Sequence, residues 1–233
     1  MDSGPISPPR RGEILFSFNE NILEGTVIAR PNRFLVEVMH EGKSILCHLH
    51  DPGRLREIIF PGNMVLFRET AGIKTSHSIV AGWNNGKWIP IDTRIHGEIA
   101  EKFLPKPFRK EVSIRGKRID YLIGNAWVEV KGCTLNIGGV ALFPDAPSRR
   151  AVEQLRVLSD LSMNGERTCV LALVLRDDVR CFVPNAGTDP GFASALSTAI
   201  GKGVNVQVHS VSFDGKSVYY EKRLPFCGES SIA

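Results

Sequence analysis

An uninterrupted apolar run at residues 169–175 constrains the fold of this chain more than any other feature. The run has the length of a strand, and a strand that is apolar at every position must be covered on both faces. The segment before it repeats apolar residues at helical spacing and ends at Asn164 and Gly165; these residues are Val152, Leu155, Leu158 and Leu161. A further helix over 191–201 and a second buried strand over 204–208 follow. This order predicts an α/β layered domain.

The first third of the chain has a different pattern, with almost no helical periodicity. Short strands are predicted at four places, separated by turns that contain Gly, Pro or Asn: residues 26–29, 34–39, 44–49 and 64–68. Several short strands in about 70 residues favour a small closed or nearly closed barrel of the OB type. A small sandwich and an SH3-like barrel are the alternatives.

The turn signal Asn84-Asn85-Gly86 marks the predicted domain boundary. The fold class is therefore α/β, in an α+β arrangement of two domains, with the barrel over residues 14–83 and the α/β domain over 84–233. Residues 1–13 are rich in proline and lack the apolar centre of a secretory signal. They are expected to form a flexible tail.

Composition excludes several classes of protein. With 42% hydrophobic and 23% charged residues in 233, the chain can bury a full core, so disorder of the whole chain is excluded. No apolar stretch approaches the roughly 20 residues that cross a membrane. The five cysteines are far apart and have no zinc-binding spacing, which predicts reduced thiols in a cytoplasmic protein. The net charge of +4 suits a polyanionic partner, although only weakly.

Three charged residues stand out in the second domain. A helix over 94–104, capped by Thr93, is predicted to precede a meander whose last strand carries Glu129 and Lys131 on one face. The preceding strand carries Asp120, and the turn between the two strands brings Asp120 next to Glu129. Two neighbouring carboxylates repel each other unless a cation lies between them, and their oxygens select Mg²⁺ or Mn²⁺.

This set of residues predicts hydrolysis of a phosphodiester by metal-activated water. Asp120 and Glu129 would hold the ion, while Lys131 would orient or activate the water. Glu101, on the preceding helix, is the candidate for an additional metal ligand. The alternative is that Glu129 and Lys131 form an ordinary ion pair at an edge strand, with Asp120 an acid near a turn.

The layout resembles the PD-(D/E)XK nuclease-like fold. Longer motifs resemble the sugar fermentation stimulation protein A (SfsA) family over nearly the whole chain; they are Glu24-Gly25, Arg33-Phe34-Leu35, His50-Asp51-Pro52-Gly53-Arg54-Leu55, Arg118-Ile119-Asp120, Val128-Glu129-Val130-Lys131-Gly132-Cys133-Thr134-Leu135, Ala141-Leu142-Phe143-Pro144-Asp145-Ala146 and Asp189-Pro190. The resemblance implies an OB-like N-terminal domain, a nuclease-like C-terminal domain and an association with DNA.

Four arginines are candidates for contact with nucleic acid: Arg33 and Arg54 in the barrel, and Arg149 and Arg150 where a helix begins. Surface charge without a ligand is the alternative for each. The leading hypothesis is a nucleic-acid-binding protein with a Mg²⁺-dependent nuclease site, acting on DNA. The alternative is a non-catalytic DNA-binding regulator of sugar-metabolism genes. The oligomeric state is left open, with a homodimer as one option.

Overall fold

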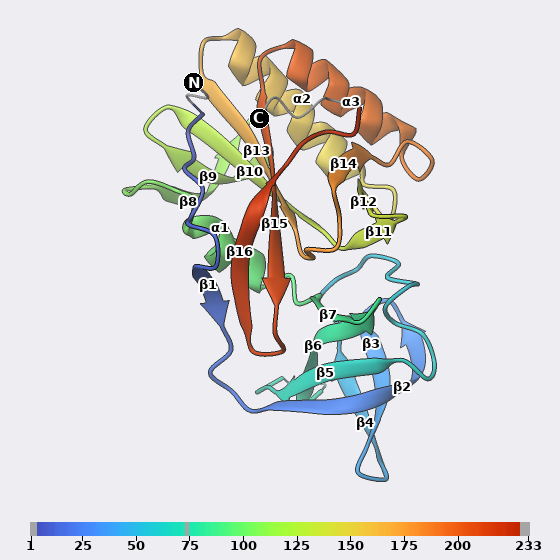
Figure 1. Cartoon of the computed structure of the whole chain (residues 1–233). Helices are drawn as coiled ribbons and strands as arrows, with labels where there is room; N and C mark the ends of the chain where they lie inside the picture. The colour runs from blue at the N-terminus through green and yellow to red at the C-terminus, as the bar shows by residue number, and fades with distance from the viewer. Residues whose placement is uncertain (1–3, 73–74, 229–233) are drawn as a thin grey trace.

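In the computed structural model, which describes residues 4–72 and 75–228, five strands close into a barrel, as the sequence predicts. They are β2 (Ile22–Asn32), β3 (Leu35–His40), β4 (Lys43–His48), β5 (Met64–Glu69) and β6 (His77–Asn84). Parallel pairing of Cys47 with His77 and of His48 with Ser78 joins β4 to β6 and closes the barrel. A hairpin partner of β6, β7 (Lys87–Pro90), extends it. Figure 1 shows this barrel beneath the larger domain.

A seven-stranded sheet forms the centre of the second domain, in the order β1-β16-β15-β13-β10-β9-β8. Its members are β1 (Ile14–Ser17), β8 (Arg109–Ile114), β9 (Lys117–Ile123), β10 (Ala126–Cys133), β13 (Arg167–Val174), β15 (Asn205–Phe213) and β16 (Ser217–Leu224). The central strands β10, β13 and β15 are parallel. The apolar run noted in the sequence is β13, which is buried along nearly its whole length.

Helices cover both faces of this sheet, which explains why β13 is apolar throughout. The helix α1 (Ile95–Glu101) packs on one face, while α2 (Arg149–Met163) and α3 (Pro190–Gly201) pack on the other. Ser148 and Asp189 cap α2 and α3 by accepting the backbone N–H groups of Ala151 and Phe192. None of the helices in the described ranges is long and apolar enough to cross a bilayer.

The predicted cap of α1 is wrong. Arg94, not Thr93, occupies the capping position, and its side chain makes no capping hydrogen bond. The Thr93 hydroxyl instead donates to the carbonyl oxygen of His50 in the barrel, at 3.0 Å. Thr93 therefore links the two domains, a role that helix-capping rules cannot reveal.

The N-terminal segment also differs from expectation. The strand β1 does not belong to the barrel but pairs with β16 at the edge of the large sheet. Ile6 is 5% exposed and belongs to the core of the second domain, and the Ser7 N–H donates to the Phe103 carbonyl. Ile6 of the expected tail is therefore packed, whereas residues 10–13 are exposed and residues 1–3 lie outside the described part. Because β7 pairs with β6, the barrel continues past the predicted boundary at residue 83 to Pro90.

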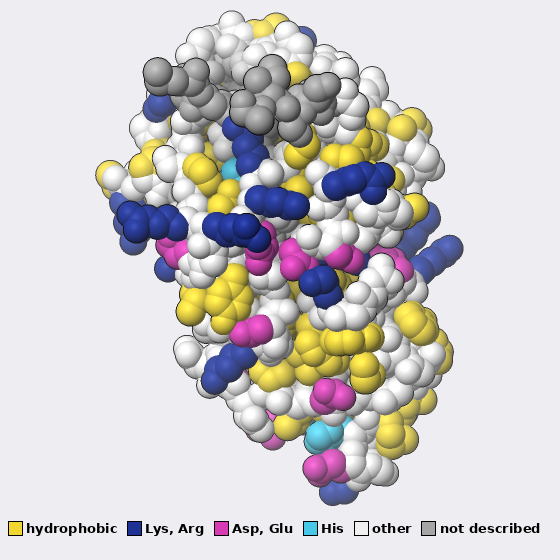
Figure 2. All heavy atoms as spheres, in the orientation of Figure 1, with side chains coloured by type: hydrophobic (Ala, Val, Ile, Leu, Met, Phe, Trp, Pro, Cys, Tyr) yellow, Lys and Arg dark blue, Asp and Glu magenta, His cyan; other side chains and the backbone are white. Residues whose placement is uncertain are grey.

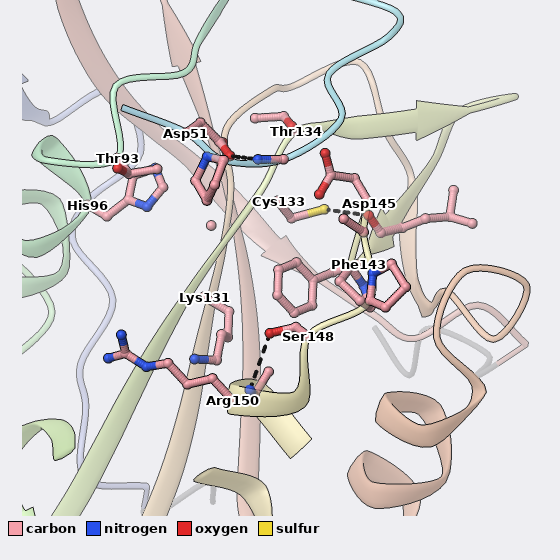
Figure 3. A pocket seen from close by; sticks show the side chains of 18 of the residues that line it. Asp51, Thr93, His96, Lys131, Cys133, Thr134, Phe143, Asp145, Ser148 and Arg150 are labelled. Atoms are coloured by element: carbon pink, nitrogen blue, oxygen red, sulfur yellow. Dashed lines mark hydrogen bonds between the residues drawn. The ribbon is translucent and has the colours of Figure 1, made fainter. Parts of the chain in front are cut away.

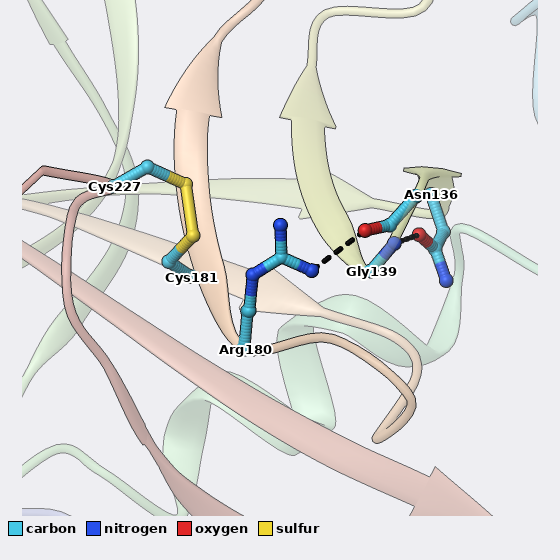
Figure 4. Close-up of a disulfide and its surroundings, with 6 residues drawn as sticks. Asn136, Gly139, Arg180, Cys181 and Cys227 are labelled. Carbon is cyan, nitrogen blue, oxygen red and sulfur yellow. Dashed lines mark hydrogen bonds between the residues drawn. A yellow bond between two sulfur atoms is a disulfide. The ribbon is translucent and has the colours of Figure 1, made fainter.

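A small sheet of β11 (Leu135–Ile137), β12 (Val140–Phe143) and β14 (Cys181–Pro184) lies beside the large one. Here the expectation that all five thiols are reduced is wrong, because Cys181 forms a disulfide with Cys227 (Figure 4). The segment after β16 runs alongside β14, where the Cys227 N–H donates to the Phe182 carbonyl. This tertiary contact joins cysteines 46 residues apart. Cys47, Cys133 and Cys169 are buried, as expected.

A buried guanidinium connects the two domains. The side chain of Arg176 is 0% exposed and makes two short contacts with the Asp178 carboxylate, 2.6 and 2.7 Å. It also donates to the carbonyl of Thr134, just after β10, and to Asn84 at the end of the barrel strand β6. One cation thereby ties the end of β10 to the barrel.

Replacement of this cation should destabilise the fold strongly. Arg176→Met removes a charged donor from the Asn84 side-chain oxygen and from the Asp178 carboxylate at the domain junction, and we expect a loss of about 3 kcal/mol in unfolding free energy. Urea unfolding measures this loss. The control is Arg180→Met, because Arg180 is exposed and its contact is with the Gly138 carbonyl; a change within about 0.5 kcal/mol is expected there. Equal losses in the two variants would contradict the role assigned to Arg176.

Candidate functional site

An interruption of the β9–β10 ladder organises the candidate site. The two strands pair from Ala126 opposite Ile123 to Val128 opposite Tyr121. Beyond that point the Asp120 carboxylate takes over as acceptor, receiving the backbone N–H of Val130 at 2.8 Å. This bond holds Asp120 beside Glu129, the residue that lies between Val128 and Val130. Burial raises the pKa of Glu129, and the neighbouring charge of Asp120 adds to that rise.

Glu129, Lys131 and Gln154 form a buried polar group on the α2 face of the sheet. Glu129 is 2% exposed and its Oε1 lies 2.5 Å from the Lys131 Nζ. The same ammonium donates to the Gln154 Oε1 at 2.8 Å, and the Gln154 Nε2 donates to the Arg118 carbonyl at 3.0 Å. Gln154 thus bridges α2 and β9 and holds the Lys131 ammonium in place.

The second oxygen of Glu129 is buried and has no hydrogen-bond partner among the described residues. Burial raises the pKa of Glu129 to about 7; the Lys131 charge opposes that rise and the Asp120 charge adds to it. Burial likewise raises the pKa of Asp120, against the bond from Val130 and the charge of Lys131. A buried carboxylate oxygen without a partner is costly to the fold. A purely structural role therefore does not explain why this carboxylate oxygen is buried.

Glu101 lies apart from this group. It is on α1, across the sheet from α2, and its carboxylate accepts the Tyr121 hydroxyl at 3.2 Å and pairs with Lys110 at 2.5 Å. Within residues 4–72 and 75–228, no three His, Cys, Asp or Glu side chains cluster closely enough to hold a metal. The structure brings together Asp120, Glu129 and Lys131 but not the expected additional ligand.

A cavity of about 510 Å³ opens beside Lys131, between the second domain and the barrel. Figure 3 shows Lys131 and Arg150 at one end of it. Asp51, from a barrel loop, and Asp145, from the loop before α2, line it further along. The cavity is therefore cationic at one end and acidic at the other.

His96, on α1, lines the same cavity. Its ring lies so close to Gly132 that an added Cβ there would be 2.2 Å from the ring carbon Cε1, so only glycine fits after Lys131. Burial lowers the pKa of His96 to about 4 and keeps the imidazole neutral at neutral pH. Its buried Nε2 has no hydrogen-bond partner within the described residues.

The four candidate arginines divide into two groups. Arg33 and Arg150 line the cavity, and the Arg33 guanidinium also lies 4.7 Å from the centre of the Phe34 ring. Arg149 points to solvent, with its side chain 92% exposed and paired with Glu153. The exposed Arg54 contributes its backbone carbonyl to Arg30 and does not line the cavity.

Gln154, His96, Asp51 and Asp145 were not among the residues assigned to the site from the sequence. Gln154 carried a usable signal, because it is a polar residue on the apolar helix face formed by Ala151, Leu155 and Leu158. The other three come from separate segments, and no spacing along the chain connects them.

Comparison with known proteins matches both domains. Residues 28–91 match the model "SfsA N-terminal OB domain", and residues 92–217 match "Sugar fermentation stimulation protein RE domain". The chain belongs to the sugar fermentation stimulation protein family. The two family models meet between residues 91 and 92, just after β7.

Relatives within this family align over nearly their full length. A homolog from Saccharolobus solfataricus is 44% identical, and the alignment covers 94% of this chain and 91% of the homolog. A homolog from Thermoplasma acidophilum is 43% identical, and the alignment covers 90% of this chain and 95% of that homolog. A solved structure, titled as Pyrococcus furiosus SfsA in complex with Ca²⁺, is 25% identical, with a TM-score of 0.84 over 92% of this chain and 99% of that one. The fold of the family is thus the fold described above.

The acidic end of the cavity should make stability depend on pH. Burial raises the pKa of Asp51 to about 6, opposed by the bond from the Gly53 N–H and reinforced by Asp145. The folded state therefore holds this proton more tightly than the unfolded state, and stability falls as pH rises from about 4 to about 6, by roughly 2 kcal/mol. Asp51→Asn should flatten that fall, because an amide does not titrate in this pH range. The amide oxygen can still accept the Gly53 N–H, so the loop contact is kept.

Urea unfolding across pH 4–7 measures this effect. Asp160→Asn is the matched control, because Asp160 pairs with Arg115 at the surface with its side chain 48% exposed. A fall in stability that persists in Asp51→Asn would assign the pH dependence to another group.

Proposed function

We propose that this member of the family binds nucleic acid, with DNA as the expected polymer, and hydrolyses phosphodiester bonds with the help of Mg²⁺ or Mn²⁺. One observation carries the proposal: the buried Oε2 of Glu129 has no hydrogen-bond partner in the described part of the chain, and it lies beside a second carboxylate and a fixed ammonium. Membership of a family with an OB domain and an RE domain supports a nucleic-acid-binding role.

The two carboxylates suit a hard divalent cation. Mg²⁺ is commonly bound through one or two carboxylates and keeps several of its waters, so Asp120 and Glu129 suffice without Glu101. A cation there would give the Glu129 Oε2 the partner that it lacks among the described residues. The solved relative from Pyrococcus furiosus is titled as a complex with Ca²⁺, another cation that prefers oxygen ligands.

A bound divalent ion supplies a polarised phosphate and a water of lowered pKa. The residues of this chain then divide the remaining work. The Lys131 ammonium would lie against the phosphate or the attacking water, and Gln154 would hold that ammonium through the bond to its Oε1. Arg150, at the start of α2, would neutralise the substrate backbone.

The alternative is a DNA-binding regulator that performs no hydrolysis. Without a cation, however, the charges of Asp120 and Glu129 would repel a phosphodiester placed near Lys131. A surface that only binds DNA would be stronger without these carboxylates. The presence of these two carboxylates beside Lys131 therefore favours a catalytic function over DNA binding alone.

Surface features of the barrel also support binding of nucleic acid. Phe34, Met39 and Leu46 are 39–42% exposed, and the Phe34 ring stacks on His48 with an interplanar angle of 3°. Exposed rings beside cations are the usual platform for unpaired bases. On the face in Figure 2, Lys and Arg side chains gather across the second domain, while acidic side chains gather near the junction with the barrel.

Cleavage of labelled DNA tests the proposal. Four substrates are tested, namely single- and double-stranded DNA and single- and double-stranded RNA. With Mg²⁺ or Mn²⁺, the wild-type chain should cut at least one of them, and EDTA should stop the cleavage. Glu129→Gln and Lys131→Met should each lower the rate at least about 100-fold, because they remove a metal ligand and a group that acts on the reacting atoms. Lys131→Met should retain binding of Mn²⁺ measured by calorimetry, whereas Glu129→Gln should lose it.

Arg149→Gln serves as the control for these variants and should cleave at nearly the wild-type rate, since Arg149 faces solvent. Absence of cleavage by the wild type with either ion on all four substrates would sink the nuclease proposal and favour the regulator.

Binding to the barrel is tested separately. Phe34→Ala in the full chain should weaken binding of a single-stranded oligonucleotide by about 1–3 kcal/mol, because one base loses its stacking partner. The affinity of the wild type should also fall steeply as salt rises. Fluorescence anisotropy measures both effects. Phe60→Ala is the matched control, since Phe60 is a 44% exposed ring outside the Phe34–His48 stack; equal weakening by the two substitutions would contradict a stacking role for Phe34.

A further inference from the structure

The cavity beside Lys131 is larger than hydrolysis alone requires. It continues from Lys131 and Arg150 past Gly132 and His96 to the barrel loop that contains Asp51 (Figure 3). Its volume of about 510 Å³ falls within the usual range for small-molecule sites. A scissile phosphate would occupy only the end near Lys131, so the rest of the space calls for a ligand of its own.

The end near Lys131 is built to hold an anion. Arg150 and Lys131 line it, together with Ser148 and Ala151 of the first turn of α2. This turn contains no acidic residue, so its free N–H groups and the two cations act in the same direction. The buried Nε2 of His96, which lacks a partner among the described residues, provides one further polar contact on the cavity wall.

The opposite end presents hydrogen-bond acceptors. Asp51 accepts the Gly53 N–H at 2.7 Å and Asp145 accepts the Leu55 N–H at 3.3 Å, each through one oxygen. Both carboxylates crowd Gly53, where an added Cβ would be 2.4 Å from the nearer oxygen of Asp145 and 2.9 Å from an oxygen of Asp51. Each carboxylate keeps its second oxygen outside these bonds. Free phosphate is an anion, which carboxylates repel, so it gives no reason for an acidic pair at this end.

The wall between the two ends includes apolar surface. Leu142, Phe143 and Pro144 line the cavity, and Figure 3 shows the Phe143 ring facing its interior. A planar, uncharged group that carries hydrogen-bond donors on its far edge would match this succession of an anion site, an apolar wall and two acceptors.

We infer that the cavity binds one unpaired nucleotide, with its phosphate at Lys131 and Arg150 and the donor edge of its base at Asp51 and Asp145. The inference rests on the proposed function, because the phosphate is taken to be that of the substrate strand. A base that is still paired in a duplex has its donor edge occupied, so the nucleotide must be single-stranded or extruded. Guanine fits best, since its N1–H and N2 amino groups are adjacent donors. Thymine presents one donor between two carbonyl oxygens, which carboxylates repel.

Titration of the full chain with nucleoside monophosphates tests the inference. These probes contain no phosphodiester, so binding can be measured with and without Mg²⁺ by calorimetry. We expect dGMP to bind at least about tenfold more tightly than dTMP, because charge-assisted hydrogen bonds are lost with thymine. Deoxyinosine monophosphate, which lacks only the N2 amino group, should fall between them.

Three variants assign the two ends. Arg150→Gln should weaken binding of all three nucleotides by a similar factor, about tenfold, because it removes one cation from the phosphate. Arg149→Gln is its matched control and should bind within about twofold of the wild type, since Arg149 faces solvent. Asp145→Asn keeps an oxygen for the Leu55 N–H and offers a donor to the cavity, so the preference for dGMP over dTMP should be lost or reversed.

The outcomes separate this inference from the nuclease proposal. Equal affinity for dGMP, deoxyinosine monophosphate and dTMP, or no binding of any of them, would overturn the nucleotide site even if the chain cleaves DNA. Discriminating binding by a chain that cleaves nothing would sustain the site and remove the catalytic function. If Asp145→Asn fails to fold, the three wild-type affinities and the Arg150 and Arg149 variants still decide.

Discussion

The buried guanidinium of Arg176 is the interaction on which the arrangement of this protein depends. Removing such a group from water is costly unless its donors are satisfied, and here Asp178, the Thr134 carbonyl and Asn84 satisfy them. Asn84 belongs to the barrel, and Thr134 follows the strand that carries Glu129 and Lys131. The same cation therefore ties the barrel to the strand that carries the candidate site, together with the bond from the Thr93 hydroxyl to the His50 carbonyl.

A second constraint acts within the site. Asp120 replaces a backbone partner in the β9–β10 ladder, and Gln154 holds the Lys131 ammonium against Glu129. One carboxylate oxygen is left buried without a partner in the described residues, although buried polar groups are usually satisfied. Strands of a core sheet rarely carry a buried carboxylate oxygen without a hydrogen-bond partner. A ligand that binds this oxygen would explain why it is buried here. The raised pKa of Glu129 has a related origin, because burial removes water from this carboxylate and the Asp120 charge adds to the effect.

Much of the fold could be predicted from local pattern. Short strands separated by turn residues predict the closed barrel, and the apolar run predicts that β13 is covered on both faces. Apolar residues at helical spacing predict the helix α2, and a helix was also predicted at α3. The failures concern long-range pairing. The strand β1 joins a sheet whose other strands lie far along the chain, Thr93 bonds to the barrel instead of capping α1, and Cys181 meets Cys227 through the segment after β16. Each of these depends on which segments meet in space, and residue periodicity does not record that.

The sequence by itself determined the group of Asp120, Glu129 and Lys131, because strand alternation and a short hairpin turn place these side chains together whatever surrounds them. It could not place Glu101, whose carboxylate lies across the sheet with Tyr121 and Lys110. Nor could it separate Arg150 from Arg149, adjacent residues of which one lines the cavity and the other faces solvent. Only the tertiary structure decided these points and assembled the cavity from a barrel loop, a helix, a strand end and a helix start. Neighbouring side chains on a helix point about 100° apart, and only the packing of that helix against the sheet decides which of them faces the site.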